Sequence, residues 1–302
     1  MAILVLLWSL LGLAWNIIGG YGGQVSLGHA VFFGLGAYTS SILLERWQVS
    51  PWLGMLAGAA VAAIAALLIG WPTFRLQGHY FAIATIAAGE IFAILFRNWE
   101  WAGGAVGIYL PLIRGDQLVN FQFHETKVPY YYIVLVMALL AVAVTYALER
   151  SRAGYYLRAL RADQDAARSL GVPITRYKLI AMVISAVLTA IGGTFYAQFV
   201  LYISPNTVFA LMLSVQMCLV AVLGGLGTIA GPIIGAMVLI PMAEYTRVFL
   251  GGRGGGLHLV VYGLLIVIIS VFQPAGLVGL LRRRTRPTPP PAMPTPAEEG
   301  IA

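Results

Sequence analysis

The chain has few charged residues and little cysteine or lysine. Only 10% of its 302 residues are Asp, Glu, Lys or Arg, whereas soluble domains average roughly 25%. No charged residue precedes Glu45, and none lies between residues 179 and 243. Cys218 is the single cysteine, which excludes an intrachain disulfide. This composition excludes an ordinary soluble globular domain.

Common catalytic and nucleotide-binding motifs are also missing. The only lysines are Lys127 and Lys178, and neither ends a G-x-x-x-x-G-K-[ST] phosphate loop, so the chain cannot hydrolyse ATP. No H-E-x-x-H, paired-cysteine or G-x-S-x-G pattern supports zinc or acyl-transfer chemistry. We therefore expect no catalytic residue, metal site or cofactor in this chain. An integral membrane enzyme is the least favoured class of protein.

Long apolar runs dominate instead. Hydrophobic residues make up 60% of the chain, and its mean hydropathy is +0.87. The runs are continuous, as in spanning helices of about 20 residues, and do not alternate as in a transmembrane barrel. The sequence predicts an all-α, polytopic transmembrane bundle of about nine spans, with eight or ten as alternatives. We place the spans near 2–18, 28–44, 52–71, 79–96, 129–148, 179–201, 207–223, 231–249 and 257–273.

The basic residues predict the orientation of the chain. Seven of the eighteen lie in residues 149–178, and a second cluster lies at 282–286. The positive-inside rule places both clusters in the cytoplasm, so the net charge of +7 reflects topology rather than nucleic-acid binding. Alternation of the spans then puts the 224–230 turn inside. The segments that we expect outside are 97–128, 202–206 and the N-terminus.

One domain accounts for most of the chain. We expect a transmembrane domain over residues 1–281, with a cytoplasmic loop at 149–178. The N-terminus has no charged n-region, so its first apolar run is expected to be a retained span rather than a signal peptide. Residues 282–302 are rich in proline and poor in apolar side chains, which predicts a disordered cytoplasmic tail.

Polar residues interrupt the apolar sequence between Gly22 and Tyr38. Gln24, Ser26 and His29 carry groups that hydrocarbon does not satisfy, so they should face protein or a water-filled path. The functional interpretation is a helix lining the translocation path, preceded by an irregular segment. The alternative is ordinary helix packing with satisfied side chains, because small residues at four-residue spacing are common in membrane bundles.

Glu90 lies in an apolar run that we expect to span the membrane. A carboxylate at the bilayer centre costs at least about 2.5 kcal/mol on insertion scales, so it needs a compensating role. It is a candidate for the translocation path, as a proton-coupling group or a substrate contact, and His29 is a candidate partner. The alternative is a structural anchor that is neutral or hydrogen-bonded.

The cytoplasmic loop contains a helix-prone segment at 155–171. Its leucines and Ala167 fall on one helical stripe, with the charges elsewhere, and Gly171 followed by Pro173 predicts the helix end. Two alanines beside an acid make a smooth surface suited to a groove on a partner. The alternative is a basic loop that rests on anionic lipid. The candidate docking residues are Leu157, Leu160, Asp165, Ala166, Ala167, Leu170 and Gly171.

Several motifs together resemble one family. Ala166-Ala167-x3-Gly171, preceded by an acid, resembles the ATPase-docking loop of bacterial ABC importer permeases, in particular those for branched-chain amino acids. The same permeases share an S-L-G-H-A-x-F-F-G-x-G-A-Y signature, found here within 23–38. Further shared stretches lie at 80–85, 202–205 and 224–232, in the family's order, so that the resemblance covers roughly residues 15–275. The chain departs from the family pattern at Asp165, where Glu is common, and at Ala102, where Thr is common.

The resemblance implies a multi-pass permease subunit in a bacterial inner membrane, within an ATP-driven importer. Such subunits pair with a second permease subunit, two cytoplasmic ATPases that bind ATP and Mg²⁺, and an extracytoplasmic solute-binding protein. The implied substrate is a small amino acid such as Leu, Ile or Val, and the surrounding lipid is the remaining partner. Two alternatives stay open, namely a urea or short-amide importer of the same type and a proton-coupled secondary transporter using Glu90 and His29.

Overall fold

The computed structural model describes residues 1–76, 78–111, 117–123, 126–250, 263–264 and 276–283. The helices and strands are α1 (Ala2–Asn16), η1 (Ile17–Tyr21), α2 (His29–Trp47), α3 (Pro51–Thr73), α4 (His79–Asn98), η2 (Glu100–Ala102), β1 (Ile108–Tyr109), α5 (Gln117–Asn120), α6 (Val128–Arg150), α7 (Arg152–Ala162), α8 (Gln164–Ser169), α9 (Ile174–Val200), β2 (Tyr202–Ile203), α10 (Pro205–Val208), α11 (Leu211–Gly224), α12 (Ala230–Leu250) and α14 (Gly276–Arg283).

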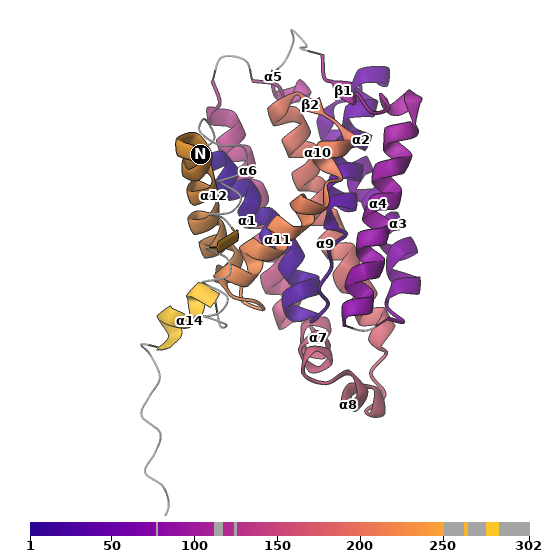
Figure 1. The fold of residues 1–302 in the computed structure, drawn as a ribbon, viewed down its shortest axis with the longest axis vertical. Coiled ribbons are helices and arrows are strands. Elements are labelled where there is room, and N and C mark those ends of the chain that lie inside the picture. The colour runs from indigo at the N-terminus through magenta and orange to yellow at the C-terminus, as the bar shows by residue number, and fades with distance from the viewer. Residues whose placement is uncertain (77, 112–116, 124–125, 251–262, 265–275, 284–302) are drawn as a thin grey trace, which may run out of the picture.

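Helix α1 lies at the centre of the bundle. It contacts α6, α9, α11 and α12, while α2, α3 and α9 pack against one another on one side of it (Figure 1). Glycines allow the close approach of α2 and α9. A Cβ atom on Gly36 would collide with the backbone oxygen of Ala190, and one on Gly193 would collide with that of Phe33. Small residues at helix crossings are the usual means of association where lipid supplies no hydrophobic drive.

The all-α, polytopic fold is confirmed, although the count of nine spans is not. Within the part of the chain that the structure describes, six helices are long and apolar enough to cross a membrane, namely Ala2–Tyr21, Pro51–Thr73, His79–Asn98, Val128–Arg150, Ile174–Val200 and Pro205–Gly224. Helices α2 and α12 coincide with two further predicted spans. The ninth, at 257–273, lies outside the described residues except for 263–264.

The packing agrees with the predicted sidedness. Strands β1 and β2 pair antiparallel, which joins the two segments expected outside, 97–128 and 202–206. At the other end, Arg161 of the basic loop lies against Gly227 of the turn expected inside. Helices α7 and α8 form this end, away from the N-terminus (Figure 1).

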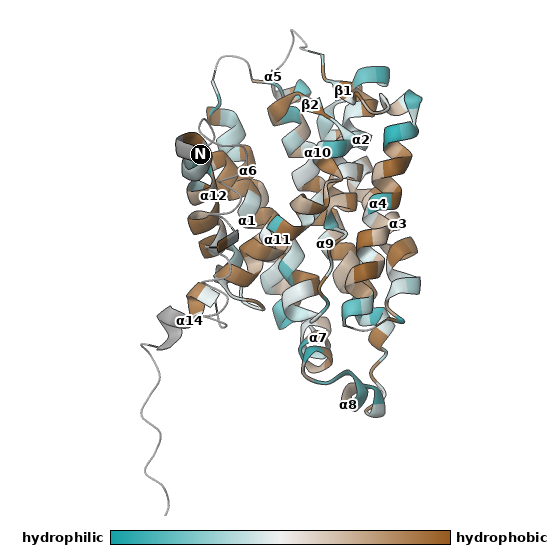
Figure 2. Cartoon of the chain, in the orientation of Figure 1, coloured by the Kyte–Doolittle hydropathy of each residue, from teal (hydrophilic) through white to brown (hydrophobic). Residues whose placement is uncertain are grey.

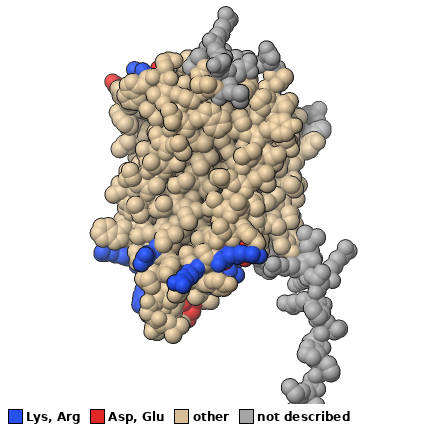
Figure 3. Space-filling model, turned by 180° about the vertical axis from the view of Figure 1, so that it is seen from behind, with Lys and Arg blue, Asp and Glu red and all other residues tan. Residues whose placement is uncertain are grey.

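Charge and hydropathy also change along the direction from the β1–β2 end to the α7–α8 end. Figure 2 shows mostly hydrophobic helices in the body of the bundle and hydrophilic residues around α7 and α8. On the face seen in Figure 3, a belt without charged residues lies above a band of Lys and Arg at the lower end. This pattern is typical of a protein that spans a bilayer with its basic end in the cytoplasm.

The boundary predicted between the membrane domain and the tail, at residues 281–282, stays a prediction. Helix α14 ends at Arg283 and packs beside α11 and α12. The remaining predicted tail, 284–302, lies outside the described residues.

Candidate functional site

The loop expected in the cytoplasm contains two helices, so the single helix predicted at 155–171 is wrong. Helix α7 ends at Ala162, and Asp163 is extended with φ −156° and ψ 117°. Its Oδ1 accepts hydrogen bonds from the backbone N–H groups of Asp165 and Ala166, at 2.8 and 3.0 Å. An aspartate with this geometry is an N-cap, which starts a new helix, α8. The expected stop at Gly171 is confirmed by its φ of +78°.

The break separates the candidate docking residues into a buried and an exposed group. Leu157 and Leu160 of α7 are buried, and Ala167 of α8 packs with Leu160 and Ile174. Leu170, by contrast, has 85% of its surface exposed. The predicted continuous apolar stripe is therefore wrong, because its first three members hold the segment against the bundle. The candidates left on the surface are Asp165, Ala166, Leu170 and Gly171.

Lys178 ties the α8 part of this segment to the membrane bundle. The sequence analysis counted it among the basic residues of the 149–178 loop, and the structure places it fully buried in the first turns of α9. Its Nζ donates to Oε1 of Gln164, at 3.1 Å, and lies 5.9 Å from the ring centre of Phe74. The start of α8 is thus tied to the membrane bundle by a polar contact as well as by packing.

Residues 22–28 form the irregular segment that was expected before α2, and hydrogen bonds from α1, α4, α9 and α11 hold this segment and the first turn of α2. Trp15 of α1 donates its Nε1–H to the backbone oxygen of Ser26, at 2.7 Å. Thr85 of α4 accepts from the N–H of Leu27, at 3.1 Å. Ser214 of α11 accepts from the N–H of Ala30, at 2.8 Å. Sequence reasoning assigned no such role to Thr85 or Ser214.

His29 completes these contacts through α9. Its Nδ1 lies 3.0 Å from Oγ of Ser26 and its Nε2 lies 2.8 Å from Oγ of Ser185. Ser185 Oγ donates its one hydrogen to the backbone oxygen of Ala14, at 2.6 Å. It must therefore accept from Nε2–H, so that Nδ1 accepts from Ser26. A neutral imidazole satisfies the whole network.

These contacts favour a packing role for Ser26 and His29. Both are buried, and neither lines a described cavity. The suggested pairing of His29 with Glu90 is wrong, because serines occupy both ring nitrogens. Gln24 is also buried, but its side-chain oxygen has no hydrogen-bond partner. Sequence reasoning missed Ser185 because 156 residues separate it from His29.

Glu90 is the predicted path residue that does line a cavity. It lies on the exposed side of α4 and borders a small space of about 30 Å³. The other walls come from the 22–28 segment, α2, α4, Phe209 and α11. A space of this size accommodates about two water molecules. Glu90 thus lies beside the irregular segment, at a surface of the single chain.

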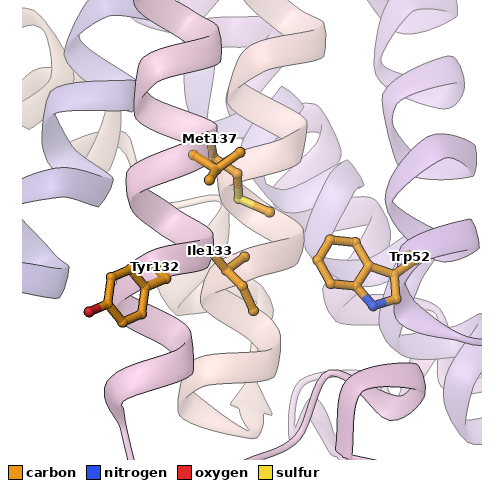
Figure 4. A pocket seen from close by; sticks show the side chains of 5 residues that line it. Trp52, Tyr132, Ile133 and Met137 are labelled. Carbon is orange, nitrogen blue, oxygen red and sulfur yellow. The ribbon is translucent and has the colours of Figure 1, made fainter.

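A larger apolar pocket lies between α3 and α6. Its volume is about 270 Å³, and it is lined by Trp52, Tyr132, Ile133, Val136 and Met137. Figure 4 shows the Trp52 ring facing Ile133 and Met137 across the gap. The pocket has no charged residue to bind the ammonium or carboxylate of an amino acid, so we do not assign substrate to it.

No group of three His, Cys, Asp or Glu side chains that could hold a metal ion occurs in the described part of the chain. The chemistry of the site is therefore hydrogen bonding, packing and charge, arranged around a break in a membrane helix.

Comparison with known proteins bears on this arrangement. Residues 1–270 match the family described as branched-chain amino acid transport system, permease component. The chain is 31% identical to the high-affinity branched-chain amino acid transport system permease protein LivM of Escherichia coli, over 93% of this chain and 70% of that protein. It is 30% identical to LivM of Salmonella typhimurium, with the same coverage.

A second kind of relative is the permease protein LivH. The LivH of Salmonella typhimurium is 27% identical over 90% of this chain and 91% of its own length. No solved structure matches the chain.

The helices that can span a membrane and these permease relatives make this a multi-pass inner-membrane protein. Its match to the family model extends over most of the chain, from the central helix α1 to beyond α12. The chain therefore belongs to the family of branched-chain amino acid transport permeases and is LivM-like.

Proposed function

We propose that this chain is the permease subunit of an ATP-driven importer for Leu, Ile, Val or a related small amino acid. ATP and Mg²⁺ would bind to two cytoplasmic ATPase subunits, and an extracytoplasmic solute-binding protein would deliver the substrate. The permease relatives named for high-affinity branched-chain amino acid transport support this proposal. The chain itself lacks a phosphate-binding loop, so the energy has to come from a partner.

The single observation that carries the coupling role is the exposure of α8. Leu170 is 85% exposed at the end of this helix, beside the exposed Ala166 and Asp165. An apolar side chain, a small side chain and an acid on one projecting helix form a surface that fits a groove on a soluble protein. Behind it, Ala167 and Leu160 are buried, so force on α8 reaches the bundle through packed side chains.

A second permease subunit would cover the outer side of α4. Tyr80, Ile83 and Ile91 are each more than 60% exposed there, in the same stripe as Glu90. A carboxylate that faced lipid would cost at least about 2.5 kcal/mol. A protein partner removes that cost, and a water-filled path between the two subunits would lie next to Glu90. The LivM and LivH relatives together support a pair of different permeases.

The test is assembly and uptake with a charge placed on the proposed docking surface. Leu170→Asp should abolish co-purification with ATPase subunits co-expressed from the same organism, and with it ATP-driven uptake of radiolabelled leucine. Leu76→Asp is the matched control, since Leu76 is 39% exposed in the turn between α3 and α4. Wild-type binding and uptake in the Leu170 variant would refute the docking role of α8.

A further inference from the structure

Arg161 connects the cytoplasmic helix α7 to the break in the first membrane helix. Its Nη1 donates a hydrogen bond to the backbone oxygen of Gly20 in η1, at 2.6 Å. Gly23 approaches the same side chain so closely that a Cβ atom there would lie 3.1 Å from Cγ of Arg161. A Cβ atom on Gly227 would collide with Nη1. Although Arg161 as a whole is exposed, its guanidinium therefore lies in a slot made of glycine backbone.

The slot is joined by hydrogen bonds to the turn before α12. Asn16, fully buried at the end of α1, accepts from the N–H of Gly227 at 2.9 Å. Its Nδ2 donates to the backbone oxygen of Thr228, also at 2.9 Å. The hydroxyl of Thr228 in turn accepts from the N–H of Gly231, at 3.1 Å, in the first turn of α12. One arginine thus touches two breaks between helices, at 17–28 and at 224–230.

The 17–28 segment has features of a conformational hinge. It begins as a π-helix, a rare form that is frequently found at functional sites. Gly23 has a φ of +65°, which other residues rarely adopt. Gln24 is 3% exposed and its Oε1 has no partner, although buried polar atoms are normally paired. The segment therefore leaves a buried acceptor unpaired in the arrangement described.

The segment ends at the contacts that hold α2. Six residues beyond Gly23 lies His29, which joins α1 and α9 through Ser185. Glu90 borders the cavity that Leu27 and Ala30 also line. Only a short stretch of chain separates Gly20 and Gly23 from the start of α2. A displacement of these two glycines would therefore reach the membrane-embedded part of the proposed path.

We infer that Arg161 is a positioning residue that transmits movement of α7 and α8 to the 17–28 hinge and to the 224–230 turn. The inference rests on the proposed function and adds the contact through which ATP-driven motion enters the membrane helices. In this arrangement, the guanidinium holds the two breaks together when α7 is in the position described. Movement of α7 withdraws or shifts Nη1 of Arg161, which donates to the backbone oxygen of Gly20. The 17–28 hinge then changes conformation.

The test separates ATP hydrolysis from transport. In proteoliposomes containing the complete complex, Arg161→Ala should hydrolyse ATP near the wild-type rate. It should import about tenfold less radiolabelled leucine per ATP, because the contact that carries the movement of α7 is missing. Arg161→Lys keeps one donor for Gly20 and should recover part of the uptake. The matched control is Arg152→Ala, which removes an exposed arginine from the first turn of the same helix.

A second variant changes Gly227, the glycine that faces Nη1 of Arg161. Gly227→Ala should reproduce the loss of uptake per ATP, because its methyl group occupies the place of Nη1. Gly263→Ala is the control, since a Cβ atom there meets nothing within 4 Å. Retained ATP hydrolysis shows that each variant is folded and assembled.

Unchanged uptake per ATP in both Arg161→Ala and Gly227→Ala would overturn the inference while leaving the proposed function intact. A parallel loss of hydrolysis and uptake in Arg161→Ala, with no recovery in Arg161→Lys, would also overturn it, because Arg161 would then be merely structural. A wild-type chain that binds no ATPase subunits would refute the proposed function itself, and this inference with it.

Discussion

The Nε2–H of His29 on α2 donates to Oγ of Ser185 on α9, over 2.8 Å. Ser185 passes the interaction on to the backbone oxygen of Ala14, so that one polar chain joins α1, α2 and α9. All of its members are buried. In a bundle held mainly by the packing of small residues, such a chain sets which helices are neighbours.

Ser185→Ala should destabilise the subunit. The change leaves two buried groups, Nε2–H of His29 and the backbone oxygen of Ala14, without this hydroxyl as a partner. A buried unpaired group lowers the free energy of unfolding by about 1–3 kcal/mol. Thermal unfolding in detergent, followed by size-exclusion chromatography, measures the loss. Ser169→Ala is the control, because Ser169 is exposed and bonds only to the backbone of its own helix. Equal unfolding temperatures for the two variants would contradict the network.

Adjacent alanines in α8 should respond differently to arginine. Ala166→Arg changes an exposed residue, so the fold of the segment should persist while ATPase binding is lost. Ala167→Arg forces a long side chain between Leu160 and Ile174, and overpacking of this kind costs about 1–3 kcal/mol or more. Limited proteolysis of the 152–174 region reports the difference. Equal protease resistance would show that the burial of Ala167 does not hold the segment.

Glu90→Gln should not abolish ATP-driven leucine uptake. Glu90 borders a cavity, yet His29 is engaged by serines and is no partner for a proton relay. In proteoliposomes, a pH gradient without ATP should drive no uptake in either wild type or variant. Gradient-driven uptake that disappears in Glu90→Gln would support a proton-coupled transporter instead.

Gly36→Ala should disrupt the crossing of α2 and α9. The added methyl group would collide with the backbone oxygen of Ala190, and backbone on both sides leaves no flexible group to give way. We expect a loss of about 1–3 kcal/mol or more, as for overpacking of a filled core. Gly89→Ala should be tolerated, because a Cβ atom there meets nothing within 4 Å. Detergent thermal stability distinguishes the pair, and equal stability would contradict the close approach.

Much of the organisation could be predicted from the residues alone. The apolar runs predict the helices because each residue contributes its own transfer free energy, which needs no knowledge of neighbours. The basic loop at 149–178 predicts the sidedness, with which the pairing of β1 with β2 and the contact of Arg161 with Gly227 agree. The irregular segment at 22–28 was predicted from its glycines and polar residues.

The roles of individual side chains were less predictable. Asp163 splits the docking segment because its carboxylate caps α8, whereas the apolar periodicity predicts one helix. Leu157 and Leu170 have the same side chain and sit on the same predicted stripe, yet one is buried and the other exposed.

The sequence by itself determined the class, the polytopic membrane character and the family, because hydropathy, charge and short motifs are properties of local stretches. Only the tertiary structure decided what the polar residues do. The partners of Asn16 lie 211 and 212 residues away, and that of Arg161 lies 141 residues away. Such pairs depend on which helices come together, and that outcome rests on the fit of the whole bundle rather than on any one segment.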